Sequence, residues 1–221
     1  MTEIHAAPQS MVFLAGIGQD ADAWRPVMAG LPTTWAATAV GVGDLVDLNE
    51  PFTIAAAIGG LDAAVGATGD VSVVLCGLSL GGVLATAYTI AHPERVSGLV
   101  LVASQVKPNP ALMIAESLAV RLLPSSWLGL PDGLTKDQAR GVLDVAGTLD
   151  FSSWLRGITQ PTLVICGERD RANLPASRHL AAALPNARLE IVADAGHELN
   201  VTHPVEVLRL VDAFLADLGE R

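Results

Sequence analysis

A serine at the centre of a glycine-rich stretch is the first candidate for chemistry. The stretch Cys76–Gly82 reads Cys-Gly-Leu-Ser-Leu-Gly-Gly, and it lies between the apolar runs Val71–Leu75 and Val83–Tyr88. This pattern predicts a strand, a sharp turn with Ser79 at its apex and the start of a helix. The glycines let the two backbones approach each other, and a strained turn would expose the serine hydroxyl. We therefore expect Ser79 to be a nucleophile.

A serine hydroxyl at neutral pH is a poor nucleophile, so it needs a nearby base, and the base needs an orienting partner. His197 follows a candidate strand in the glycine-containing segment Asp194–Glu198. Glu168 and Asp170 follow another candidate strand, and Asp194 is a third acidic candidate. In a parallel sheet these residues would all lie near the carboxyl ends of strands, where open α/β folds place their chemistry. The sequence order is therefore serine, acid, histidine.

Apolar runs without alternation predict strands that are covered on both faces, as in parallel sheets. Candidate strands are Ser10–Ala15, Trp35–Val40, Val71–Leu75, Val96–Ala103, Pro161–Cys166 and Ala187–Val192. Candidate helices between and after them are Ala21–Leu31, Thr53–Val65, Val83–Tyr88, Ala172–Leu184 and Pro204–Leu218. Gly41–Asp44 is expected to be a loop. The alternation predicts an α/β fold with a mostly parallel, doubly wound sheet of about six strands.

The strand pattern stops between Gln105 and Gly157, where the sequence predicts a helical insertion. Asn109–Leu123 has the pattern of an amphipathic helix, and Thr135 with Gln138 forms a capping-box sequence at the start of a helix to about Thr148. The insertion is too small for an independent domain and suits a lid. Its apolar stripe, which includes Met113 and Trp127, fits core packing and substrate contact equally well.

Several segments together resemble the α/β-hydrolase superfamily over residues 11–218. They are Leu14–Gly18, Gly77–Gly82, His92–Val96, Leu99–Val102, Ile158–Asp170 and Gly196–His197. The resemblance implies a core of residues 1–104 and 158–221, with residues 105–157 as a helical lid. It also implies that Ser79 is the nucleophile, His197 the general base and then acid, and Asp170 the acid that orients the imidazole. The oxyanion hole would consist of the backbone N–H groups of Ile17 and Leu80.

Two departures from the family pattern affect these expectations. Many relatives have a histidine where this chain has Ala15. Because the donated group is a backbone amide, catalysis is expected to survive this difference. Relatives also usually carry a β-hairpin before the first strand, where this chain has only about ten residues. The sheet edge exposed by its loss would be compatible with a homodimer.

Composition excludes some classes of function. A formal net charge of −10 and a pI near 4.8 argue against nucleic-acid binding, and no apolar run approaches the length of a membrane-spanning helix. We expect a cytoplasmic protein whose Cys76 and Cys166 are buried and unpaired. No metal-ligand spacing is present, and Gly16–Gly18 lacks the third glycine of a dinucleotide fingerprint. We therefore expect neither a metal nor another cofactor.

These residues lead to the hypothesis of a serine hydrolase that cleaves a small apolar carboxylic ester, lactone or thioester through an acyl-enzyme intermediate. Two alternatives remain at this stage. One is a related acyltransferase or perhydrolase that uses the same three side chains. The other is a non-catalytic ligand receptor or regulatory protein that keeps the fold and the pocket.

Overall fold

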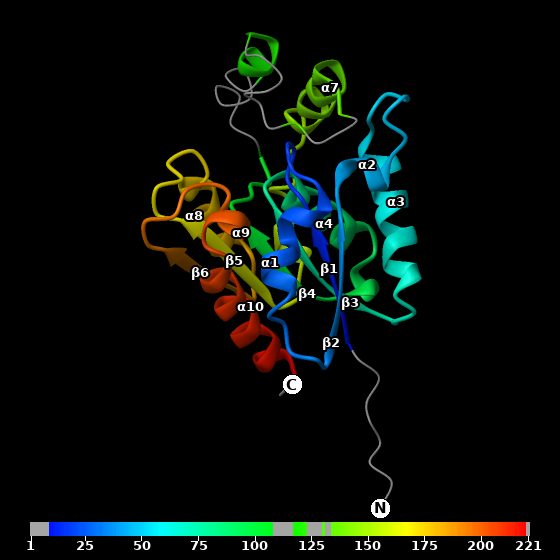
Figure 1. The fold of residues 1–221 in the computed structure, drawn as a ribbon. Coiled ribbons are helices and arrows are strands. Elements are labelled where there is room, and N and C mark those ends of the chain that lie inside the picture. Colours follow the sequence, from blue (N-terminus) through cyan, green and yellow to red (C-terminus); the bar gives the residue numbers. More distant parts are fainter. Residues whose placement is uncertain (1–8, 108–116, 123–129, 131–133, 220–221) are drawn as a thin grey trace, which may run out of the picture.

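The computed structural model describes residues 9–107, 117–122, 130 and 134–219 (Figure 1). Its six strands form one parallel sheet in the order β2-β1-β3-β4-β5-β6. The strands are β1 (Gln9–Leu14), β2 (Trp35–Val40), β3 (Val73–Leu78), β4 (Val96–Val102), β5 (Thr162–Gly167) and β6 (Ala187–Val192). The predicted parallel α/β sheet is thus confirmed, and its order reverses at β1 and β3, which lie side by side.

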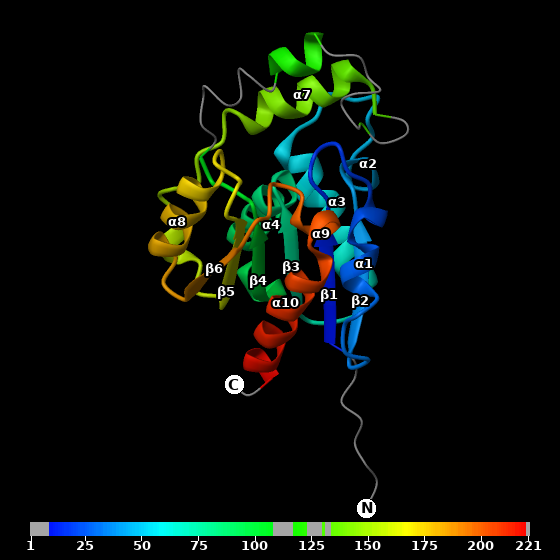
Figure 2. The same cartoon turned by 60° about the vertical axis from the view of Figure 1, so that its left-hand side comes forward.

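Helices cover both faces of this sheet (Figure 2). The labelled helices, of which α7 lies beyond the end of the sheet, are α1 (Arg25–Met28), α2 (Val42–Leu45), α3 (Ile54–Ala67), α4 (Leu80–Ala91), α7 (Lys136–Ala146), α8 (Leu174–Ala183), α9 (Leu199–Thr202) and α10 (Pro204–Gly219). Helices α3, α4 and α8 pack in one buried cluster, whereas α1 and α10 pack in the cluster on the opposite face. Short 3-10 turns are formed by Ala21–Trp24, Pro93–Arg95 and Leu155–Gly157.

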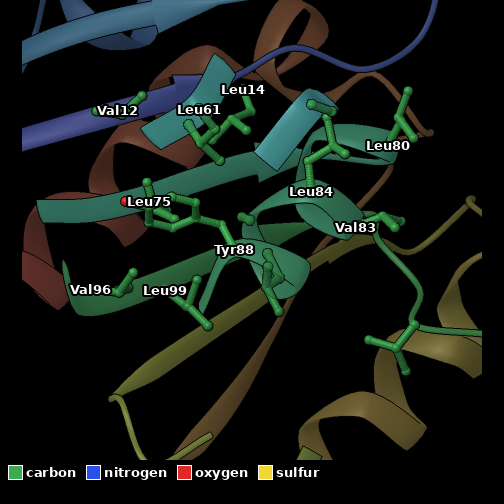
Figure 3. Packing of buried hydrophobic residues seen from close by; sticks show 14 of the residues in the cluster. Val12, Leu14, Leu61, Leu75, Leu80, Val83, Leu84, Tyr88, Val96 and Leu99 are labelled. Carbon is green, nitrogen blue, oxygen red and sulfur yellow. The ribbon is translucent and has the colours of Figure 1, made fainter. Parts of the chain in front are cut away.

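The central strands are apolar throughout because both of their faces are covered. Every residue of β3 is buried, and successive side chains join opposite clusters: Leu75 packs with α3 and α4, while Val74 and Cys76 pack with α10. Figure 3 shows Leu75, Tyr88 and Leu99 in the first of these clusters. The sheet therefore holds the carboxyl ends of its strands in fixed relative positions.

Local structure differs from the expectation at two places, and a third expectation falls only partly on the described residues. The helix expected over Ala21–Leu31 is split into a 3-10 turn and the one-turn α1, because Pro26 suits only the first turn of a helix. The Gly41–Asp44 segment overlaps the helical turn α2, where the Asp44 carboxylate accepts the Gly41 N–H at 2.7 Å. Of the helix expected over Asn109–Leu123, residues 117–122 are helical and the others lie outside the described residues.

The insertion between β4 and β5 places α7 beyond the carboxyl ends of the strands (Figure 1). The predicted capping box at Thr135 and Gln138 is confirmed at the start of α7. The Gln138 side chain also donates to the Leu48 carbonyl at 2.7 Å, which ties α7 to the core. At the base of the insertion, the Phe151 N–H donates to the Val106 carbonyl at 2.9 Å. The two ends of the insertion therefore lie side by side.

Candidate active site

Ser79 lies in the turn between β3 and α4, as the sequence predicts. Its φ of 52° is in a region that residues other than glycine rarely occupy. The turn persists because surrounding bonds hold it: the Ser79 N–H donates to Val102 at 2.9 Å, and the Ser79 carbonyl accepts the Gly82 and Val83 N–H groups. Backbone strain of this kind is concentrated at functional sites.

Glycines allow this turn to pack against its neighbours. A Cβ atom added at Gly77 would lie 2.3 Å from the Gly81 carbonyl carbon, and one added at Gly81 would lie 2.3 Å from the Leu14 oxygen. Neither position can carry a side chain unless the backbone moves. The amino terminus of α4 is thereby brought against the end of β1, so Leu80 presents its backbone N–H at the positive end of a helix.

The loop after β1 contacts the serine. A Cβ atom added at Gly16 would lie 3.5 Å from the Ser79 Cβ, which is van der Waals contact. The Gln19 N–H donates to the Gly16 carbonyl at 3.1 Å and closes a turn in which Gly18 has a φ of 85°. Ile17 lies inside this turn. The structure therefore brings the segment that contains Ile17 next to Ser79.

His197 and Asp170 lie in direct contact, with 2.8 Å between His197 Nδ1 and Asp170 Oδ2. The Asp170 side chain is 4% exposed and the His197 side chain 41% exposed, so the acid is buried behind an accessible imidazole. Burial raises the pKa of the Asp170 carboxyl, but the hydrogen bond and the charge of His197, together with hydrogen bonds from Asn173, outweigh it. The net pKa lies below the ordinary value, which keeps Asp170 a carboxylate.

The other two acidic candidates have different partners. Asp194 forms an ion pair with Arg169, and the Glu168 carboxylate accepts the Asp194 backbone N–H at 3.1 Å. Of the three acids, it is Asp170 that bonds the imidazole of His197. Cys76, three residues before Ser79, is fully buried, and this burial raises the pKa of its thiol.

The segment that carries His197 crosses the carboxyl edge of the sheet. At one end, a Cβ atom added at Gly167 of β5 would lie 2.3 Å from the Gly196 oxygen. At the other end, Asn200 bonds Gln19 in the loop after β1. Between β5 and β1 in the sheet lie β4 and β3, and β3 leads to Ser79. His197 and Ser79 therefore lie at the same edge of the sheet, the edge formed by the carboxyl ends of the strands.

Sequence reasoning missed two sets of buried amides. Asn173 donates from Nδ2 to both carboxylate oxygens of Asp170, at 3.0 and 3.1 Å, and its backbone N–H donates to Oδ1 at 3.1 Å. Gln19 and Asn200 form a pair between the two loops. The only signal in the sequence is that each amide lies within three residues of a candidate site residue.

An apolar cavity of about 190 Å³ separates α7 from the loop after β1. Its walls are Ile17, Gly18, Ala119, Val120, Leu130, Ala139 and Leu143. A second cavity of about 140 Å³ lies on the other side of Ile17 and Gly18, against Asp20, Asp44 and Leu48. Met113 and Trp127, the candidates for lid packing or substrate contact, lie outside the described residues.

Among the described residues, no group of three or more His, Cys, Asp or Glu side chains is arranged to hold a metal ion. None of the helices in that part of the chain combines the length and apolar character needed to cross a bilayer.

Comparisons with known proteins agree with this architecture. A protein of Pseudomonas syringae pv. syringae proposed to be the carbamate hydrolase RutD is 30% identical over 172 residues, which cover 63% of this chain and 66% of that protein, just under two thirds of its length. Pimeloyl-[acyl-carrier protein] methyl ester esterase of Neisseria meningitidis serogroup B is 27% identical over 234 residues, or 89% of each chain.

Among solved structures, the enol-lactonase from Burkholderia xenovorans superimposes with a TM-score of 0.83 at 20% identity. The alignment covers 97% of this chain and 94% of the enol-lactonase, and it shows a shared fold. The profile of the alpha/beta hydrolase family matches residues 11–210, which is most of the chain. The chain therefore belongs to the alpha/beta hydrolase family.

Proposed function

We propose that this protein is a serine hydrolase that cleaves a small carboxylic ester, lactone or thioester through an acyl-enzyme intermediate. The observation that carries the proposal is the 2.8 Å contact between His197 and a buried, ionised Asp170, which follow strands of the same parallel sheet whose β3 leads to the strained turn of Ser79. A buried carboxylate that accepts from Nδ1 favours the tautomer whose Nε2 can take up a proton.

In the proposed reaction, Ser79 Oγ attacks the substrate carbonyl carbon while His197 Nε2 takes the hydroxyl proton. The negative charge that forms on the carbonyl oxygen is stabilised by the backbone N–H groups of Leu80 and Ile17. The imidazolium then protonates the leaving group, and the carbon–heteroatom bond breaks to give the acyl-enzyme. A water molecule, deprotonated by His197, attacks the ester of Ser79, and collapse of the second intermediate releases the acid and regenerates the serine.

The relatives support the reaction class more strongly than the substrate. Their names describe a carbamate hydrolase, a methyl ester esterase and an enol-lactonase. All three names denote hydrolysis at an acyl carbon, whereas the groups attached to that carbon differ. The apolar cavity beside Ile17 favours an apolar acyl or alcohol group. We therefore assign residues 105–157 the role of a lid that selects the substrate.

The test is labelling by a fluorophosphonate together with turnover of short-chain nitrophenyl esters. Ser79→Ala should lose both, by at least about 1,000-fold in turnover, because it removes the nucleophile. Ser97→Ala is the matched control, since Ser97 is an exposed residue at the start of β4, where the strand is farthest from the site. Residual labelling of Ser79→Ala would overturn the proposal. If the wild type is labelled but turns over none of the esters, the alternative of a non-catalytic ligand receptor would be favoured instead.

A further inference from the structure

The side chains of Gln19 and Asn200 form a reciprocal amide pair across 181 residues of sequence. Asn200 Nδ2 donates to Gln19 Oε1 at 2.9 Å, and Gln19 Nε2 donates to Asn200 Oδ1 at 3.3 Å. Gln19 is 9% exposed and Asn200 is fully buried. Each amide therefore supplies both a donor and an acceptor to the other in a largely buried position.

Gln19 closes the turn of the loop whose Gly16 lies beside Ser79. Its backbone N–H closes the turn onto the Gly16 carbonyl at 3.1 Å, and Ile17 lies within that turn. Only Gly18 separates Ile17 from Gln19, and its φ of 85° is a conformation that glycine adopts without strain. A shift of the Gln19 side chain would consequently move the backbone N–H of Ile17.

Asn200 is connected in the same way to the segment that carries His197. It lies in α9, whose first residue donates its N–H to the His197 carbonyl at 3.1 Å. Asn200 Nδ2 also approaches the Ala23 carbonyl at 3.3 Å, and Gln19 Nε2 approaches Glu198 Oε1 at 3.4 Å. The amide pair thus links the His197 segment to the loop after β1 through buried hydrogen bonds.

We infer that Gln19 and Asn200 are positioning residues that fix the distance between the oxyanion donor of Ile17 and the imidazole of His197. This inference rests on the proposed function, because it needs Ile17 and His197 to act in the same reaction. Apolar side chains of similar size could fill the same space, but they would not set a distance, since only hydrogen bonds are directional. Reacting groups misplaced by about 1 Å can cost 100-fold in rate.

The decisive variant replaces both amides, as Gln19→Met with Asn200→Leu. Removing both members of the pair leaves neither amide unpaired, while the Ala23 carbonyl and the exposed Glu198 carboxylate each lose one long contact, so the double variant should fold with only a small loss of stability. If the pair positions the site, kcat should still fall by about 10- to 100-fold while KM changes by less than about threefold. Each single variant leaves one buried amide unpaired, so it should lose stability as well as kcat.

A second variant tests rescue by exchanging the two residues, as Gln19→Asn with Asn200→Gln. The exchange keeps both amides and the combined length of the two side chains, so kcat should return to within about threefold of the wild type. Thr89→Val is the control for loss of a buried hydrogen bond away from the site. Thr89 is buried in α4 and its hydroxyl donates to the Ala85 carbonyl, four residues earlier.

The outcomes separate this inference from the function on which it depends. Full kcat in the folded apolar double variant would overturn the positioning role, provided that Ser79→Ala is inactive. A low kcat in both double variants would also overturn it, because an intact amide pair would then have failed to restore the rate. Activity of Ser79→Ala would overturn the proposed function itself, whatever the amide variants do.

Discussion

The acid–imidazole pair shows how buried hydrogen bonds set the state of a single group. Asp170 accepts hydrogen bonds from His197 and from the side chain and backbone of Asn173. Burial alone would favour the neutral acid, yet these donors hold the pKa of Asp170 below its ordinary value. A carboxylate that stays ionised can stabilise an imidazolium without taking its proton. Asn173 therefore helps to keep Asp170 ionised, although the sequence analysis named only Asp170 and His197.

Asn173→Leu should destabilise the protein at neutral pH by about 1.5–3 kcal/mol, because a buried carboxylate loses charge-assisted hydrogen bonds. A group whose folded pKa is depressed contributes stability above its unfolded pKa and loses it as the pH falls through the folded value. For an aspartate the unfolded pKa is about 3.9. The difference between variant and wild type should therefore shrink as the pH falls below about 4.

Urea unfolding near pH 7 and again near pH 3 measures this difference directly. Asn186→Leu is the control, since the Asn186 side chain is exposed and donates to the Thr159 carbonyl far from the site. A destabilisation of Asn173→Leu that is equal at both pH values would show that Asn173 acts by packing alone.

At the scale of the element, α7 forms one wall of the candidate substrate site. Ala139 and Leu143 of α7 pack with Val120, and Ile17 from the loop after β1 packs against this cluster. The same side chains line the cavity of about 190 Å³. One helix therefore contacts both the core and the space beside the proposed oxyanion donor. Enlarging the side chains of α7 that face the cavity should therefore alter which esters are cleaved, while the chemical mechanism stays the same.

Ala139→Phe should place a ring in this cavity, because Ala139 is fully buried at its wall. We expect kcat/KM for a nitrophenyl octanoate to fall by about tenfold or more relative to the acetate, since apolar pockets discriminate by chain volume. Overpacking should cost about 1–3 kcal/mol of stability. Asp144→Phe, which adds the same ring on the exposed side of α7, is the control, and equal losses on both esters would contradict the assignment of this cavity.

The sequence predicted elements best where a pattern has one physical cause. Continuous apolar runs indicated the sheet, and glycines at fixed spacing indicated the turn of Ser79, because each reflects local sterics or burial. The paired amides of Gln19 and Asn200 had no such signal, since their partners are 181 residues apart. The split of the helix expected over Ala21–Leu31 was also missed, although Pro26 was visible. Contacts between loops depend on the assembled sheet, so local patterns do not reveal them.

For the whole molecule, the strand order decides where the chemistry can be. The chain adds β2 on one side of β1 and then β3 on the other, so the connections that follow β1 and β3 diverge at their carboxyl ends. Open α/β sheets bind ligands in the crevice at such a switch point. The Gly16 loop follows β1 and Ser79 follows β3, and the insertion carrying α7 lies beyond the same edge (Figure 1). We therefore expect the core to carry the reaction and the insertion to select the substrate.

Excision of residues 108–149 tests this division of tasks. The Phe151 N–H donates to the Val106 carbonyl at 2.9 Å at the base of the insertion, so the two cut ends lie close enough for a short glycine linker to join them. The shortened chain should keep its sheet, with a loss of several kcal/mol because Val142 and Ala146 no longer cover the core cluster. It should still react with a fluorophosphonate at Ser79, and it should lose the discrimination between octanoate and acetate esters. Circular dichroism, fluorophosphonate labelling and the two kcat/KM values measure these properties. A shortened chain that folds but is not labelled would mean that the insertion helps to form the reactive site itself.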